Sequence, residues 1–205
     1  MVDAPATQQL RTALVGRLER RIDELVDAVC SAIIVQVIPY QQLARPATLK
    51  EFRSDIRTSL HTYLRTIARR TGVTPQDLDR FRRLGAERAR QGLSSRDVVD
   101  ALEAGMGACW RYVRQAAMEG DDDPRVATEV VAELAVEAFA ILKEVSGALV
   151  AGHASEQGRG TYTHARTVAE FVARLVDGTR GDERDLQRAS RTVGVEIGQR
   201  WTLLL

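Results

Sequence analysis

Three histidines are the side chains of this 205-residue sequence best suited to hold a cofactor. His61 lies in the middle of an amphipathic segment, so it could be an axial haem ligand if the chain forms a globin-like bundle. The sequence offers no second ligand for such a haem, which favours an ordinary surface or partly buried histidine. His153 and His164 flank a glycine-containing stretch, where solvated side chains are favoured over a metal or proton-sensing role.

The two cysteines, Cys30 and Cys109, lie in apolar stretches, where an unpaired cysteine usually behaves as a small buried hydrophobe. Neither stands at a metal-ligand spacing from a histidine. We therefore predict no metal site, no cofactor and a reducing environment. The N-terminal residues lack a signal-peptide pattern and no later stretch approaches a membrane span, so we expect a cytoplasmic protein without membrane contact.

Motifs that carry catalysis are missing from the sequence. It contains no Gly-x-Ser-x-Gly nucleophile elbow, no phosphate-binding loop and no His-Glu-x-x-His metalloprotease motif. Its 29 basic and 28 acidic residues leave a formal net charge of +1, so no overall positive field attracts nucleic acid. We predict a protein without catalytic residues, whose DNA contacts, if any, are local or made by a part outside this chain.

One local cluster of basic residues lies between residues 79 and 90. At helical spacing, Arg80, Arg83, Glu87 and Arg90 share one face, so a carboxylate lies among the guanidinium groups. This arrangement favours a solvated, salt-bridged face over a surface that contacts DNA.

Apolar residues recur every three or four positions through most of the chain, which predicts an all-α, multi-helix bundle. Proline, glycine and capping residues divide this pattern into separate helices. Small residues gather in the fourth helix and would allow another helix to cross closely; they are Ala101, Ala104, Gly105, Gly107 and Ala108. The predicted helices cover about residues 10–37, 48–71, 75–91, 95 onward, 125–154 and 163–176, with a short one near 182–189.

The fifth predicted helix, about residues 125–154, is the longest and is apolar on more than one side. Such a helix lies either at the centre of a core or in contact with a second subunit. Leu134, Ala138, Ile141 and Val145 form a stripe with alternating spacings of three and four. We predict that this stripe forms the interface of a homodimer or higher homo-oligomer.

The composition changes after this helix. We expect residues 1–155 to form one helical sensor and dimerisation domain, residues 156–162 a hinge, and residues 163–205 a linker helix and the beginning of a second domain. Residues 201–205 have the pattern of a buried β-strand, so the chain is expected to end just inside an α/β domain. An apolar tail that packs back onto the helices is the alternative.

The segment of residues 83–113 carries a family resemblance. In it, a Leu-Gly-x-x-Arg-Ala-x-Gln-Gly turn precedes a helix that contains a tryptophan, and the matching positions are Leu84, Gly85, Arg88, Ala89, Gln91, Gly92 and Trp110. This segment resembles the helical N-terminal domain shared by PucR-type bacterial transcription regulators and the RsbR or RsbRD type of stressosome co-antagonist. Residues 172–178, the acidic segment after them, and residues 193–195 and 201–205 look like the start of the degenerate GGDEF-like domain of PucR-type regulators, which favours that branch.

The resemblance implies a non-haem, roughly globin-like sensor and dimerisation domain that responds to an unknown small-molecule effector. It also implies that DNA is bound only through a C-terminal helix-turn-helix domain absent from this chain. It assigns no ligand-binding residue. Two other functions stay open, namely a protein-interaction scaffold of the stressosome type and a haem or gas sensor that uses His61.

Overall fold

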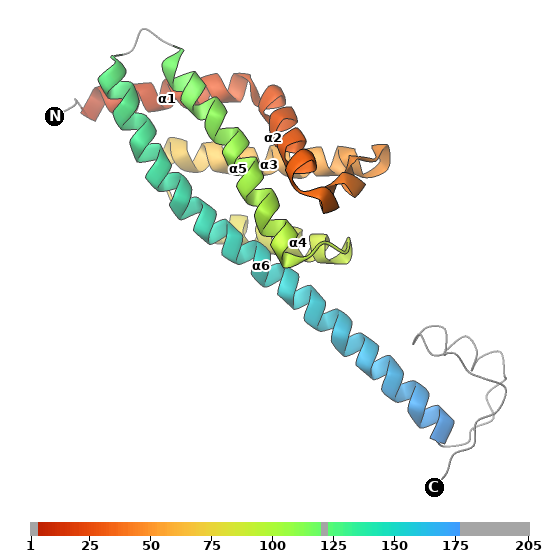
Figure 1. Cartoon of the computed structure of the whole chain (residues 1–205). Helices are drawn as coiled ribbons and strands as arrows, with labels where there is room; N and C mark the ends of the chain where they lie inside the picture. Colours follow the sequence, from red (N-terminus) through yellow and green to blue (C-terminus); the bar gives the residue numbers. More distant parts are fainter. Residues whose placement is uncertain (1–3, 120–122, 177–205) are drawn as a thin grey trace. The chain divides into compact units, whose positions relative to one another are not determined.

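A computed structural model describes residues 4–119 and 123–176, and in these ranges the chain is helical apart from short turns (Figure 1). The all-α prediction is therefore confirmed for the described residues, while the globin-like arrangement and the following α/β domain stay predictions. The elements are α1 (Ala4–Arg20), α2 (Ile22–Gln36), the 3-10 helix η1 (Ile38–Ala44), α3 (Pro46–Arg69), α4 (Pro75–Arg90), α5 (Ser95–Met118) and α6 (Pro124–Val176).

The first predicted helix, residues 10–37, is two helices in the structure. The break lies at Arg21, whose backbone (φ −106°, ψ 22°) leaves the helical region between α1 and α2. The Arg21 guanidinium bonds to Glu24 at 3.1 Å and to Glu119 at 2.9 Å, and it lies 5.3 Å from the centre of the Tyr112 ring. Apolar residues continue at helical spacing on both sides of Arg21, so the sequence pattern gave no sign of the break.

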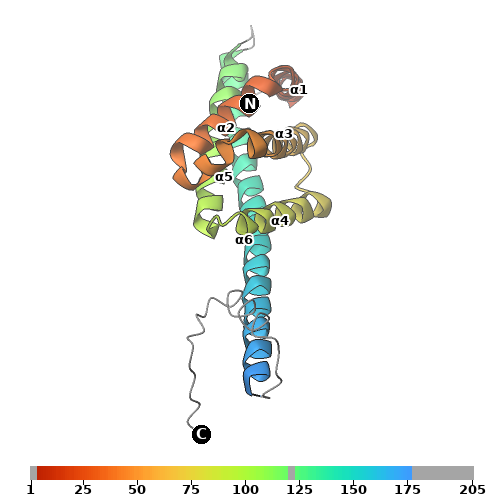
Figure 2. The same cartoon turned by 90° about the vertical axis from the view of Figure 1, so that its right-hand side faces the viewer.

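Helix α5 crosses α2 closely (Figures 1 and 2), which agrees with the close crossing that the sequence predicted for the helix rich in small residues. A Cβ atom added to Gly105 would lie 3.3 Å from a Val29 side-chain carbon and 3.4 Å from an Ile33 side-chain carbon. Ala101, Ala104 and Ala108 are buried in the same crossing. A Cβ atom at Gly105 would therefore press on both side chains, whereas one at Gly107 would meet nothing within 4 Å.

Helices α4 and α6 also cross closely, through two glycines. A Cβ atom on Gly85 would lie 2.0 Å from the Leu149 carbonyl oxygen, and one on Gly152 would lie 1.9 Å from the Arg82 carbonyl oxygen. Neither distance is possible for a real side chain, so both positions require glycine. The backbones of the two helices therefore touch directly, which fixes α4 on the inner part of α6.

The stripe that the sequence predicted as a homo-oligomer interface lies inside the chain's own core. Leu134, Ala138, Ile141 and Val145 are all at most 8% exposed. They face the hydrophobic core that the preceding helices share. The sequence could not separate the two readings of a broadly apolar helix, because core contacts and subunit contacts need the same residue types. Among the large apolar side chains described for α6, Val136 and Phe139 are exposed.

Helix α6 continues past the point where the sequence predicted its end near residue 154. Residues 156–162, the predicted hinge, are helical in the structure, because helices tolerate single glycines at a cost of about 1 kcal/mol each. The chain divides into two compact units, residues 1–154 and 155–205, which we describe separately. A hinge at this place stays a prediction, and the predictions for residues 177–205 lie outside the described residues.

Candidate functional site

A cavity of about 120 Å³ lies within the first unit, between the helices. Its wall is almost entirely apolar, and every element from α2 to α6 contributes to it. Two of the four residues of the buried α6 stripe, Ile141 and Val145, line the cavity. The wall comprises Val29, Ile33, Tyr40, Phe52, Asp55, Ile56, Ser59, Leu60, Thr62, Tyr63, Phe81, Leu84, Arg88, Val98, Ala101, Leu102, Gly105, Met106, Cys109, Ile141, Leu142, Val145 and Leu149.

Tyr63 brings an unsatisfied polar atom to this wall. Its side chain is buried, and its hydroxyl makes no hydrogen bond with the described residues. Burial raises the pKa of the Tyr63 hydroxyl, so the group is a neutral phenol at physiological pH. A buried hydroxyl without a partner costs about 1–3 kcal/mol, which makes Tyr63 a site where a bound molecule could form the missing bond.

The charged residues of the wall, Arg88 and Asp55, neutralise each other. The Arg88 guanidinium donates to an Asp55 carboxylate oxygen at 2.6 Å and to the side-chain oxygen of Gln91 at 2.7 Å. It also lies 5.6 Å from the centre of the Phe52 ring. Arg88 is one of the motif positions of the family resemblance, and its role here is to join α4 to α3 at the edge of the cavity.

Two other ionisable groups of the wall are uncharged at physiological pH. Burial raises the pKa of the Tyr40 hydroxyl to about 12 and that of the Cys109 thiol to about 12. Cys30, outside the wall, is also buried, and burial raises the pKa of its thiol to about 11. Both cysteines are free and buried, as the sequence predicted. As protonated thiols they are poor nucleophiles.

The glycine that ends the family motif closes α4 with a turn that only glycine adopts easily. Gly92 has a φ of +80°, its amide donates to the Ala89 carbonyl at 3.0 Å, and the next amide, of Leu93, donates to the Arg88 carbonyl at 3.1 Å. The side chain of Ser94 then accepts a hydrogen bond from the Asp97 amide and begins α5. The motif therefore sets the angle between the two helices that carry Arg88 and Cys109.

His153 lies against this turn and is buried, contrary to the solvated position that the sequence favoured. Its side chain is 1% exposed, and its Nε2 lies 2.7 Å from the carbonyl oxygen of Leu93. The Nδ1 atom has no hydrogen-bond partner among the described residues. The neighbouring Gly152 brings the α6 backbone close enough to α4 for the imidazole to reach the turn, a tertiary contact that no local pattern announces.

His61 is exposed and does not line the cavity, so it cannot present an axial ligand there. This geometry removes the support for a haem sensor that uses His61. Within residues 4–119 and 123–176, no three His, Cys, Asp or Glu side chains gather as metal ligands would. The side chain of His164 lies outside the described residues.

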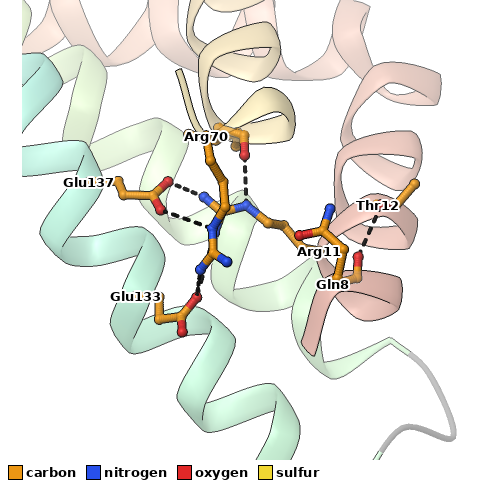
Figure 3. A network of polar contacts seen from close by, with 7 residues as sticks. Gln8, Arg11, Thr12, Arg70, Glu133 and Glu137 are labelled. Atoms are coloured by element: carbon orange, nitrogen blue, oxygen red, sulfur yellow. Dashed lines mark hydrogen bonds and ion pairs between the residues drawn. The ribbon is translucent and has the colours of Figure 1, made fainter. Parts of the chain in front are cut away.

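A second polar cluster, centred on the buried Arg11, ties α1 and α3 to α6 (Figure 3). The Arg11 Nε atom donates to the Ile67 carbonyl at 2.6 Å, and its guanidinium pairs with Glu137 and, at 3.6 Å, with Glu133. Arg70, at the end of α3, also pairs with Glu133. The sequence gave no signal for this cluster, because its members lie up to 126 positions apart.

The basic cluster on α4 contains two salt bridges within the helix, and one of them joins two residues of the predicted face. Arg90 bonds to Glu87 at 2.6 Å, and Arg82 pairs with Asp79. Arg80 lies over the Phe81 ring at 5.9 Å, and burial lowers the pKa of its guanidinium. These arginines are thus engaged by neighbours on their own helix.

Comparison with known proteins gives one family match. The family model described as "RsbT co-antagonist protein rsbRD N-terminal domain" matches residues 22–167. Among the curated proteins and among the solved structures, none matches the chain. The matched range includes the cavity wall and the motif turn, and the family indicates a sensory or scaffold role. No helix in the described part of the chain is long and apolar enough to cross a membrane.

Proposed function

Because the chain belongs to the RsbRD N-terminal domain family, we propose that it is a signal-input module that binds a small effector and associates with itself. The module would be the N-terminal domain of a cytoplasmic PucR-type transcription regulator. In such a protein, DNA would be bound by a helix-turn-helix outside this chain. The module itself would carry out no catalysis, and its output would be a change in the packing of α5 and α6.

The cavity is the observation that carries this proposal. A well-packed core leaves few voids larger than a water molecule, yet here a cavity of about 120 Å³ is bounded by residues from five helices and η1. One wall is formed by α6, through Ile141, Leu142, Val145 and Leu149. A ligand that fills the cavity would contact α5 and α6 together. It would therefore stabilise the arrangement of these two helices in which both contact the ligand.

Self-association is proposed through the outer face of α6. Val136 and Phe139 are each 72% exposed there, whereas Ile141, two positions from Phe139, lines the cavity. The same turn of helix would therefore face the effector on one side and a second copy of the chain on the other. Exposed aromatic and aliphatic side chains of this size commonly anchor subunit contacts.

Sedimentation velocity tests both parts of the proposal. The wild-type chain is expected to dimerise, and F139E to raise the dimer dissociation constant at least about tenfold, since burying a charge costs more than 1.4 kcal/mol. I38E is the control, because Ile38 is 73% exposed and lies on η1. A monomeric wild type, or a dimer that F139E leaves intact, would contradict self-association through this face.

Cavity filling tests the link between effector and dimer. A101L and C109M each add atoms at a wall position, so each imitates occupancy. We expect one or both to change the dimer dissociation constant severalfold while circular dichroism stays native. Equal dissociation constants in wild type and in both folded variants would contradict an effector role for the cavity.

A protein-interaction scaffold of the stressosome type is the second candidate, which the family match itself favours. The family takes its description from an RsbT co-antagonist protein. A scaffold would form assemblies larger than a dimer, and filling the cavity would not change them. The same sedimentation series therefore separates the two functions.

A further inference from the structure

We propose that the cavity binds a neutral, mainly apolar molecule of about six or seven non-hydrogen atoms, with one oxygen that hydrogen-bonds to the Tyr63 hydroxyl. This ligand class rests on the proposed effector role of the cavity. It follows from the size of the cavity, the charge balance of its wall and the one polar atom left unsatisfied there.

Size limits the ligand first. The cavity of about 120 Å³ is slightly smaller than an engineered apolar cavity of about 150 Å³ that binds benzene. It is well below the roughly 300 Å³ at which sites for drug-sized molecules begin. A single ring with one substituent is therefore near the upper limit that the cavity accepts without rearrangement.

Charge limits the ligand next. Among the described residues, the wall has two charged side chains, Asp55 and Arg88, and they are paired at 2.6 Å. A charged ligand would either break this pair or enter the cavity without a counter-ion, and both are costly in an apolar environment. An uncharged ligand avoids both costs.

The polar contact comes from Tyr63. Of the buried side-chain atoms without a hydrogen-bond partner in the described residues, the Tyr63 hydroxyl is the one that belongs to the cavity wall. The other polar side chains there include Ser59, whose hydroxyl already donates to the Asp55 carbonyl at 2.8 Å. One free hydroxyl matches one oxygen on the ligand, and the remaining ligand surface would contact hydrocarbon.

Phenol and toluene form a matched pair of probes, because they have the same size and differ only in a hydroxyl and a methyl group. Titration calorimetry would give both dissociation constants for wild type and Y63F. Y63F keeps the ring and removes only a hydroxyl without a partner, so it should fold as stably as wild type. Y112F is the control, since Tyr112 does not line the cavity.

We expect both probes to bind wild type, and Y63F to weaken phenol relative to toluene by about two- to tenfold, the effect of one hydrogen bond. Y112F should leave the ratio unchanged, and benzoate should not compete. The ligand class would be overturned if neither probe bound, if Y63F left the ratio unchanged, or if benzoate bound as tightly as phenol. Nuclear Overhauser effects from the probe to the Met106 and Ile141 methyl groups would establish that it occupies the cavity.

Failure of this inference is distinguishable from failure of the proposed function. If neither probe binds but A101L or C109M still changes the dimer dissociation constant, the effector role stands and the ligand class is wrong. If the probes bind as expected but cavity filling leaves the dimer unchanged, the ligand class stands and the effector role is wrong.

Discussion

The guanidinium of Arg88 lies 2.6 Å from the carboxylate of Asp55, and this contact joins the end of α4 to α3 at the wall of the cavity. Arg88 is almost fully buried, whereas the Asp55 side chain is 39% exposed. The pair thus places a charge in the protein interior that depends on one partly solvated partner. The free energy of unfolding of the protein should therefore fall when either side chain is removed.

D55A should lower the free energy of unfolding by about 2–3 kcal/mol, because it leaves the buried Arg88 charge unpaired. Urea denaturation measures this value. The double variant D55L/R88M should lose less than the sum of D55L and R88M alone, since removing both charges removes the unpaired one. Strictly additive losses would show that the pair does not act as a unit.

G85A and G152A should each destabilise the protein by about 3 kcal/mol, because the new methyl group would overlap a backbone carbonyl of the facing helix. G147A is the control on the same helix as Gly152, with nothing within 4 Å of the added atom. It should raise the free energy of unfolding by about 0.5–1 kcal/mol. Thermal and urea unfolding would both report the contrast, and similar effects for all three variants would argue against the α4–α6 crossing.

H153A should cost about 2–3 kcal/mol, because it removes the hydrogen bond to the Leu93 carbonyl and leaves a void. H61A should change the free energy of unfolding by less than about 0.5 kcal/mol, since His61 is exposed. Equal effects at the two histidines would contradict the positions assigned to them.

Asp77 should make stability depend on pH below about pH 5. Burial alone would raise the pKa of its carboxyl group, but hydrogen bonds from the Thr74 hydroxyl and the Arg65 guanidinium, the latter at 2.7 Å, outweigh burial and lower it. Because the folded-state pKa lies below that of the unfolded chain, the carboxylate stabilises the fold above the unfolded pKa. This contribution is lost as the pH falls through the folded pKa.

D77N should therefore be less stable than wild type by about 1 kcal/mol at pH 7, and the difference should shrink as the pH falls below about 4. D100N is the control, since the Asp100 side chain is 47% exposed and pairs with Arg96 on α5. If the stability difference between D77N and wild type stayed constant from pH 7 to pH 3, the carboxylate charge would not be the cause of the stabilisation.

Local signals in the sequence were enough to predict α3, α4 and α5 and the buried cysteines. Pro75 after Thr74, and Gly92 before Ser94, marked the ends of α4 and the start of α5, because capping depends on neighbouring residues. Gly105 indicated the close crossing of α5, and a Cβ atom added there would lie only 3.3 Å from the Val29 side chain of α2. Each of these features is encoded within a few positions.

Features that depend on distant residues were missed or misassigned. The Tyr63 hydroxyl lacks a partner only because of what surrounds it in the fold, and Arg11 finds Glu137 only after α6 has packed. The stripe containing Leu134 was assigned to a second subunit, although it packs in the chain's own core. The motif at Arg88 was recognised, but its pairing with Asp55, 33 positions away, was not.

Hydrogen–deuterium exchange in the cavity-filled variants A101L and C109M tests the signal-input role most directly. We expect that filling the cavity slows exchange in its α6 wall, residues 141–149, and also changes exchange severalfold in residues 155–176, which belong to the second compact unit. Exchange that changes in the wall but stays at wild-type rates in residues 155–176 would contradict the claim that the cavity sends a signal along α6.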